Sequence, residues 1–177
     1  MNIYLIGYRA TGKTTIGRRL AEKMDLCFID SDALIEETLS MPISGIVVMH
    51  GWEGFRQMES AAISALSGKE GLIVATGGGV VLDPDNVAQL RQTGTVVWLD
   101  ASPATIVSRM ASDPATTAQR PPLTQHAPSI ADEVHETLQH RRPLYLEAAH
   151  IHITTDNSTT EALCDHILSL LPESPPP

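Results

Sequence analysis

The residues most able to do chemistry begin with a glycine-rich segment near the start of the chain. Residues 7–14 match the pattern Gly-x-x-x-x-Gly-Lys-Ser/Thr, directly after an apolar run and directly before a segment with helical spacing. Glycines let successive backbone amides turn toward phosphate oxygens, and the start of the next helix adds its positive end. A glycine-rich turn that binds nothing is the alternative, but the motif and its context together favour a phosphate-binding loop.

The chemistry predicted for this loop is that of nucleotide phosphates held with magnesium. Lys13 can neutralise the β- and γ-phosphates, and the Thr14 hydroxyl can bind the metal ion that bridges them. The loop alone does not distinguish a kinase from an ATPase, a GTPase or a regulatory switch. The predicted nucleotide contacts in the loop are Ala10, Thr11, Gly12, Lys13, Thr14 and Thr15.

Two carboxylates, Asp30 and Asp32, follow the second apolar run. An open parallel sheet carries its ligand crevice at the carboxyl ends of the strands, so both side chains should lie beside the phosphate loop. There Asp30 can hold magnesium through water, and Asp32 can accept a hydrogen bond from a substrate hydroxyl as a base or orienting group. The alternative is structural: Asp32 caps a helix that begins at Ala33, and Asp30 is a solvated strand end.

Short apolar runs and longer segments with helical spacing alternate along the chain. This alternation predicts an α/β fold with a mostly parallel sheet that helices cover on both faces. The predicted strands are residues 3–6, 27–29, 72–75, 96–99 and 151–153. The predicted helices are residues 13–24, 33–39, 54–66, 86–92, 104–110, 130–147 and 160–171.

Two stretches interrupt this alternation within what we expect to be a single domain of 177 residues. Residues 31–66 hold more helix than a crossover requires and are predicted to form a substrate-binding subdomain. Residues 111–128, rich in Pro, Thr, Ala and Gln, are predicted to form a mobile lid. The core would then comprise residues 1–30, 67–110 and 129–171, followed by a disordered tail at residues 172–177.

Composition limits the classes of partner. The chain has 21 acidic and 12 basic residues and a net charge of −9, so nucleic acid is not an expected partner. The apolar run at residues 3–6 ends at Gly7, so we expect neither a signal peptide nor a membrane span. We therefore expect a cytoplasmic protein. Cys27 and Cys164 show no metal-ligand spacing and are predicted to be reduced core residues.

Beyond the phosphate loop, six further segments stand in a distinctive order and spacing. They are Asp30-Ser31-Asp32, Phe55 to Glu59, Ala75 to Gly79, Val97 to Ala101, Arg120-Pro121, and Arg141 with Tyr145. In these segments the chain resembles the shikimate kinases over nearly its whole length, and most closely the second type of that family. The resemblance implies a five-stranded parallel sheet in the three-layer sandwich of the P-loop NTPases and nucleoside monophosphate kinases.

The resemblance also implies which residues hold the substrate. Arg56 and Arg141 would grip a carboxylate with forked donors, and Asp32 would bind the reacting hydroxyl. The glycines at residues 77–79 would bring backbone amides close to a substrate ring. The alternative for these glycines is a flexible strand exit. The predicted substrate contacts are Asp32, Arg56, Gly77, Gly78, Gly79 and Arg141.

On the nucleotide side, the resemblance implies that Arg120 stabilises the transferred phosphoryl group, with Lys13 and Asp32 as the other catalytic residues. It also implies that Arg109 packs against adenine. Taken alone, Arg120 is a solvated loop charge and Arg109 a helix surface residue. The implied magnesium ligands are Thr14 and Asp30.

The resemblance therefore implies an enzyme that transfers the γ-phosphoryl group of MgATP to the 3-hydroxyl of shikimate. Two alternatives stay open: a kinase for another small hydroxy acid such as gluconate, or a non-catalytic nucleotide-binding regulator. We expect a monomer.

Overall fold

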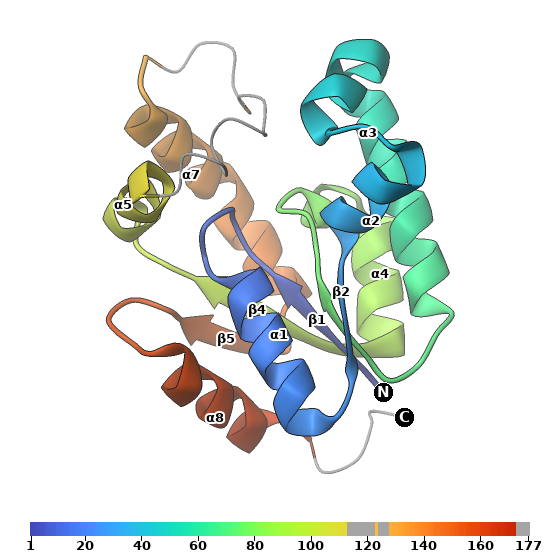
Figure 1. Ribbon diagram of the computed structural model, residues 1–177. Helices are drawn as coiled ribbons and strands as arrows, with labels where there is room; N and C mark the ends of the chain where they lie inside the picture. The colour runs from blue at the N-terminus through green and yellow to red at the C-terminus, as the bar shows by residue number, and fades with distance from the viewer. Residues whose placement is uncertain (113–122, 124–127, 173–177) are drawn as a thin grey trace.

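The computed structural model describes residues 1–112, 123 and 128–172. Its five strands form one parallel sheet in the order β2-β3-β1-β4-β5 (Figure 1). The strands are β1 (Asn2–Ile6), β2 (Cys27–Asp30), β3 (Leu72–Ala75), β4 (Gly94–Asp100) and β5 (Ile151–Thr154). Each of them coincides with a predicted strand, so the prediction of a five-stranded parallel sheet is confirmed.

Helices cover both faces of this sheet, as predicted. Two of them, α1 (Lys13–Met24) and α8 (Thr160–Leu170), pack on one face. Three others, α3 (Ile43–Ser67), α4 (Pro84–Thr93) and α7 (Ile130–Ala148), pack on the other. The remaining elements are α2 (Ser31–Leu39), α5 (Pro103–Ser112) and the short 3-10 helix η1 (Val80–Leu82). Within the described ranges, no helix combines the length and the apolar character needed to cross a membrane.

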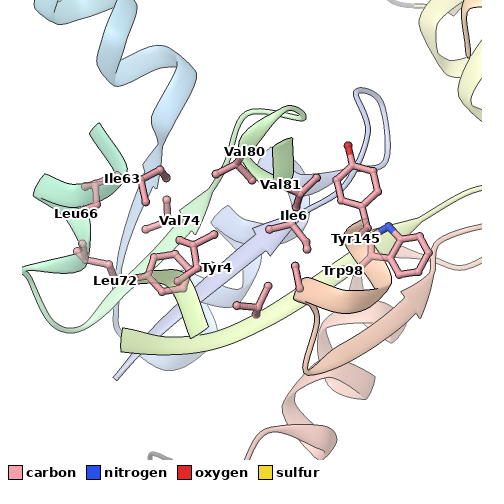
Figure 2. Packing of buried hydrophobic residues seen from close by; sticks show 13 residues of the cluster. Tyr4, Ile6, Ile63, Leu66, Leu72, Val74, Val80, Val81, Trp98 and Tyr145 are labelled. Atoms are coloured by element: carbon pink, nitrogen blue, oxygen red, sulfur yellow. The ribbon is translucent and has the colours of Figure 1, made fainter. Parts of the chain in front are cut away.

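The core consists of two layers because neighbouring residues of a strand point to opposite faces of the sheet. On the central strand β1, Ile3 and Leu5 pack toward α1 and α8, whereas Tyr4 and Ile6 pack toward α3, α4 and α7. Figure 2 shows this second cluster, with Tyr145 of α7 beside Trp98 of β4. All five residues of β1 are buried, as expected for a parallel strand covered on both faces.

Two smaller clusters lie outside these layers. Ile106 of α5 packs with Val134 of α7, and Ile35 of α2 packs with Phe55 of α3. In Figure 1, α5 and the start of α7 lie on the left of the view, and α2 and α3 lie on the right. The α3 helix is broken at Gly51, where φ is 68° and ψ is 175°, so residues 31–67 hold three helical segments. Residues 113–122 and 124–127 of the predicted lid, and 173–177 of the predicted tail, lie outside the described residues.

The structure excludes one alternative and overturns one expectation. The helix after β2 begins at Ser31, and its cap is Asp30, whose carboxylate accepts hydrogen bonds from the amides of Asp32 and Ala33. Asp32 is therefore inside the first turn and does not cap the helix. Cys27 is exposed and not part of the core, because β2 is an edge strand of the sheet.

Candidate active site

The phosphate loop connects β1 to α1 in a conformation that requires its glycines. Gly7 and Gly12 have φ values of 139° and 95°, which side chains rarely allow. A Cβ at Gly7 would also lie 2.2 Å from the carbonyl oxygen of Leu99. The helix begins at Lys13, whose Nζ donates to the carbonyl oxygens of Gly7 and Tyr8, both at 2.8 Å. The Lys13 side chain therefore folds back over the predicted phosphate-binding loop.

The two predicted magnesium ligands lie side by side. The Thr14 hydroxyl donates to Oδ2 of Asp30 at 2.9 Å, while Oδ1 of Asp30 caps α2. A hydroxyl and a carboxylate are hard oxygen donors, which suit magnesium. In the part of the chain that the structure describes, no group of three or more His, Cys, Asp or Glu side chains could hold a metal. Such a pair fits a magnesium ion that takes most of its ligands from phosphates and water.

A cleft runs from the phosphate loop toward α5 and the segment after β5. Arg109 of α5 lies in its wall and donates to Ala10 O at 3.1 Å, to Thr155 Oγ1 at 3.0 Å and to Thr155 O at 2.8 Å. The predicted nucleotide contacts of the loop and Arg109 thus share one cleft. This arginine joins the phosphate loop to the segment after β5.

Next to Thr155 of this wall lies a second polar junction, centred on Asp156. Its carboxylate accepts hydrogen bonds from the amide and hydroxyl of Ser102 and from the hydroxyl of Thr105, at the start of α5. These hydrogen bonds hold the pKa of Asp156 below its ordinary value, and the bond from Thr105 has the largest effect. Asp156 therefore fixes the segment after β5 against the start of the helix that carries Arg109.

A second cavity lies between α3, the segment after β3 and α7. It brings together residues that are far apart in the sequence. Its walls include all six predicted substrate contacts: Asp32, Arg56, Gly77, Gly78, Gly79 and Arg141. Asp32 and Arg141 are only 7% and 9% exposed, so charged groups that are largely withdrawn from solvent line this cavity.

Arg56 is oriented by the neighbours it has on α3. Its Nη1 donates to Oε2 of Glu59 at 2.6 Å, and its guanidinium lies over the rings of Trp52 and Phe55 at 5.4 and 5.3 Å. Glu59 is 1% exposed, and burial raises its pKa although Arg56 opposes the shift. The buried Glu59 carboxylate therefore holds the Arg56 guanidinium in place.

Two of the glycines after β3, Gly77 and Gly79, are in such close contact with neighbouring side chains that a Cβ would clash. A Cβ at Gly77 would lie 2.3 Å from Oε1 of Glu59 and 2.7 Å from Oδ1 of Asp32. The Gly77 amide also donates to Ser31 Oγ at 3.0 Å, so this turn is tied to the first turn of α2. The backbone of this segment packs closely against α2 and α3, which a flexible strand exit would not do.

Arg9 is a site residue that the motif does not identify, because it stands at a variable position of the phosphate loop. It is 7% exposed, and it lines both the cleft and the second cavity. Its Nη1 lies 3.9 Å from Oε1 of Glu133 on α7. Within the described residues, Arg9 and Asp32 are the two side chains that the cavities share. The predicted catalytic residue Arg120 lies outside the described residues.

Comparison with known proteins decides the family. A family model described as shikimate kinase matches residues 9–172. This chain belongs to the shikimate kinase family. A shikimate kinase from Syntrophus aciditrophicus is 42% identical over 173 residues, which cover 94% of this chain and 89% of that protein. The solved structure of a shikimate kinase from Acinetobacter baumannii in complex with shikimate has a TM-score of 0.88 and 36% identity, with 96% and 91% of the two chains covered.

Membership of the shikimate kinase family confirms three predictions: an ATP-dependent phosphotransferase, the shikimate kinase assignment itself, and the three-layer P-loop fold. A gluconokinase from Sinorhizobium meliloti has a TM-score of 0.56 and 15% identity, with 95% and 89% of the chains covered. At that identity the likeness shows the fold alone.

Proposed function

We propose that this protein transfers the γ-phosphoryl group of MgATP to the 3-hydroxyl of shikimate. The observation that carries the proposal is the place of Asp32, which lines both the cleft of the phosphate loop and the cavity that holds Arg56 and Arg141. A hydroxyl bound at Asp32 in the second cavity would face a phosphoryl group in the first.

Asp32 would act as the base or orienting group for the attacking oxygen. A carboxylate within hydrogen-bond distance of the hydroxyl can accept its proton as the oxygen–phosphorus bond forms and the bond to ADP breaks. Arg9, between the same two cavities, would face the negative charge of the transferred group. Arg120 would add to this stabilisation, as the resemblance implies.

The phosphate loop would bind ATP through its amides and the amino-terminal end of α1. For Lys13 to reach the β- and γ-phosphates, it would exchange hydrogen bonds to Gly7 O and Tyr8 O for bonds to phosphate oxygens. Thr14 and Asp30 would hold magnesium, which supplies charge neutralisation at the phosphates when bound. Arg109, held by Thr155, would pack against the adenine.

The acid group of the substrate would be bound by the two arginines of the second cavity. Arg56 and Arg141 approach from α3 and α7, so a carboxylate between them would be fixed in direction as well as in charge. This arrangement selects a hydroxy acid over a neutral polyol. We propose residues 31–66 as the subdomain that carries this half of the site.

Both cavities are lined by residues of one chain, so the proposed reaction needs no second copy, and we propose a monomer. ATP is supplied in the cytoplasm, where we propose that the protein acts.

The substrate can be tested directly by incubating the protein with MgATP and shikimate or gluconate, and following phosphate esters by phosphorus NMR. Formation of a shikimate ester without a gluconate ester is the expected result. Esterification of gluconate instead would favour the alternative hydroxy-acid kinase, and binding of ATP without any ester would favour a regulator.

A further inference from the structure

The carbonyl oxygen of Gly78 accepts two hydrogen bonds from the same helix. The hydroxyl of Tyr145 donates at 2.5 Å, and Nη1 of Arg141, one turn earlier on α7, donates at 3.0 Å. A carbonyl oxygen has two lone pairs, so this acceptor is saturated. The carbonyl direction of Gly78 is therefore set by Tyr145 and Arg141 together.

This contact also sets the direction of the next amide. No peptide bond in the described chain is cis, and a planar trans peptide places its C=O and N–H on opposite sides. Fixing the Gly78 carbonyl toward Tyr145 thus turns the Gly79 N–H away from that hydroxyl. Gly78 and Gly79 both line the second cavity, whereas Tyr145 lines neither cavity of the described residues.

The phenol ring has little freedom to move. Tyr145 is 0% exposed, and its ring stacks on Trp98 with centroids 5.8 Å apart and planes 24° from parallel. In Figure 2, its hydroxyl points away from Trp98 and out of the apolar cluster. Burial raises the pKa of Tyr145 to about 12, so the hydroxyl keeps its proton and remains a donor at neutral pH.

Gly78 lies close to the phosphate loop as well. A Cβ placed on it would lie 3.4 Å from the carbonyl oxygen of Gly7 and 3.8 Å from the Tyr145 hydroxyl. The Gly78 peptide is thus enclosed between the phosphate loop and α7. A shift of this peptide would change the lining of the hydroxy-acid cavity without changing any side chain in it.

We propose that Tyr145 is a positioning residue for the hydroxy-acid site, whose hydroxyl fixes the Gly78–Gly79 peptide and so aims the Gly79 amide and Arg141 at the substrate. The inference rests on the proposed function, because it assigns that cavity to shikimate. It adds a residue that does not touch the substrate to the determinants of its binding.

The test is Tyr145→Phe, which removes one hydroxyl and keeps the ring on Trp98. One hydrogen bond corresponds to about a threefold to tenfold change in a binding constant. We expect KM for shikimate to rise by about that factor, and KM for MgATP to stay within about twofold. A structural role alone would move both constants together or neither.

Tyr4→Phe is the matched control. Tyr4 belongs to the same apolar cluster, is also 0% exposed, and its hydroxyl bonds to Thr93 and Asn2. The midpoint temperature of thermal unfolding of each variant measures how much stability the protein loses when the buried hydroxyl is removed. Tyr4→Phe should leave both KM values unchanged even if its midpoint falls as far as that of Tyr145→Phe.

The outcomes separate this inference from the proposed function. If the wild type phosphorylates shikimate but Tyr145→Phe leaves KM for shikimate unchanged, the inference alone is overturned. An equal rise in KM for shikimate in Tyr4→Phe would overturn it in the same way. If the wild type releases no shikimate-dependent ADP, the proposed function fails, and the inference that rests on it fails as well.

Discussion

The guanidinium of Arg56 lies directly against the backbone of Gly79. A Cβ built on Gly79 would come within 2.1 Å of Nη1 and 2.2 Å of Cζ of Arg56. The same guanidinium is held by Glu59 and lies over Trp52 and Phe55, so it is not free to retreat. The position of the arginine therefore depends on the absence of a side chain at residue 79.

Gly79→Ala should displace Arg56 and raise KM for shikimate at least tenfold, because a charge-assisted contact contributes roughly 1.5–3 kcal/mol. KM for MgATP should change little. Gly68→Ala is the control, since a Cβ there would meet no atom closer than 3.8 Å and φ is −76°. Steady-state kinetics of both variants provide the test, and equal behaviour of the two would contradict the account.

Asp156→Asn should weaken nucleotide binding and leave shikimate binding unchanged. The carboxylate joins the segment after β5 to Ser102 and Thr105, and an amide cannot accept all of these bonds. We expect KM for MgATP to rise about threefold to tenfold. Asp165→Asn, which removes an exposed pairing with Lys23, should have no such effect. A rise in KM for shikimate instead would refute the role given to Asp156.

Thr14→Val should raise the magnesium concentration needed for half-maximal activity, because it replaces the hydroxyl that we propose as a ligand with a methyl group. Thr14→Ser keeps the hydroxyl that donates to Asp30 and should behave nearly as the wild type. Titration of activity with magnesium at fixed ATP compares the three proteins. An unchanged magnesium requirement in Thr14→Val would show that Thr14 is not a ligand.

Glu59 should make stability depend on pH. Burial raises its pKa in the folded protein above the ordinary value of 4.5, against the opposing effect of Arg56. The folded state then holds this proton to higher pH than the unfolded state, so the stabilisation is complete below the unfolded pKa and is lost as pH rises through the folded pKa.

Glu59→Gln removes this titration. The free energy of unfolding of the variant, relative to the wild type, should therefore increase as pH rises above the ordinary pKa of 4.5. Urea denaturation across this range measures the difference, with Glu53→Gln as an exposed control on the same helix. A difference that does not vary with pH would argue against the raised pKa.

Local motifs made much of the site predictable. The phosphate loop is encoded by contiguous residues, because the φ values at Gly7 and Gly12 and the helix start at Lys13 follow from the motif itself. Strand positions were predictable for a similar reason, since each strand is a short apolar run between turns. The boundary at Asp30 was not, because Asp30 and Asp32 are both suitable caps and only the backbone conformation chooses between them.

Features that depend on strand order or on distant contacts were beyond the local pattern. Cys27 is exposed because β2 lies at the sheet edge, which its apolar neighbours do not reveal. Arg9 is identified as a site residue only by the fold, which places it near Glu133 of α7 and in the lining of both cavities. Tyr145 likewise needed the fold to bring Gly78 to its hydroxyl.

Asp32 lines both the cleft that we propose for the nucleotide and the cavity that we propose for the hydroxy acid. The most direct measurement is ADP release from MgATP with and without shikimate, for the wild type, Asp32→Asn and Arg56→Ala. We expect shikimate-dependent release by the wild type, with kcat reduced about 100-fold or more in Asp32→Asn and KM for shikimate raised in Arg56→Ala. ADP release that shikimate does not increase, or that survives undiminished in Asp32→Asn, would contradict this expectation.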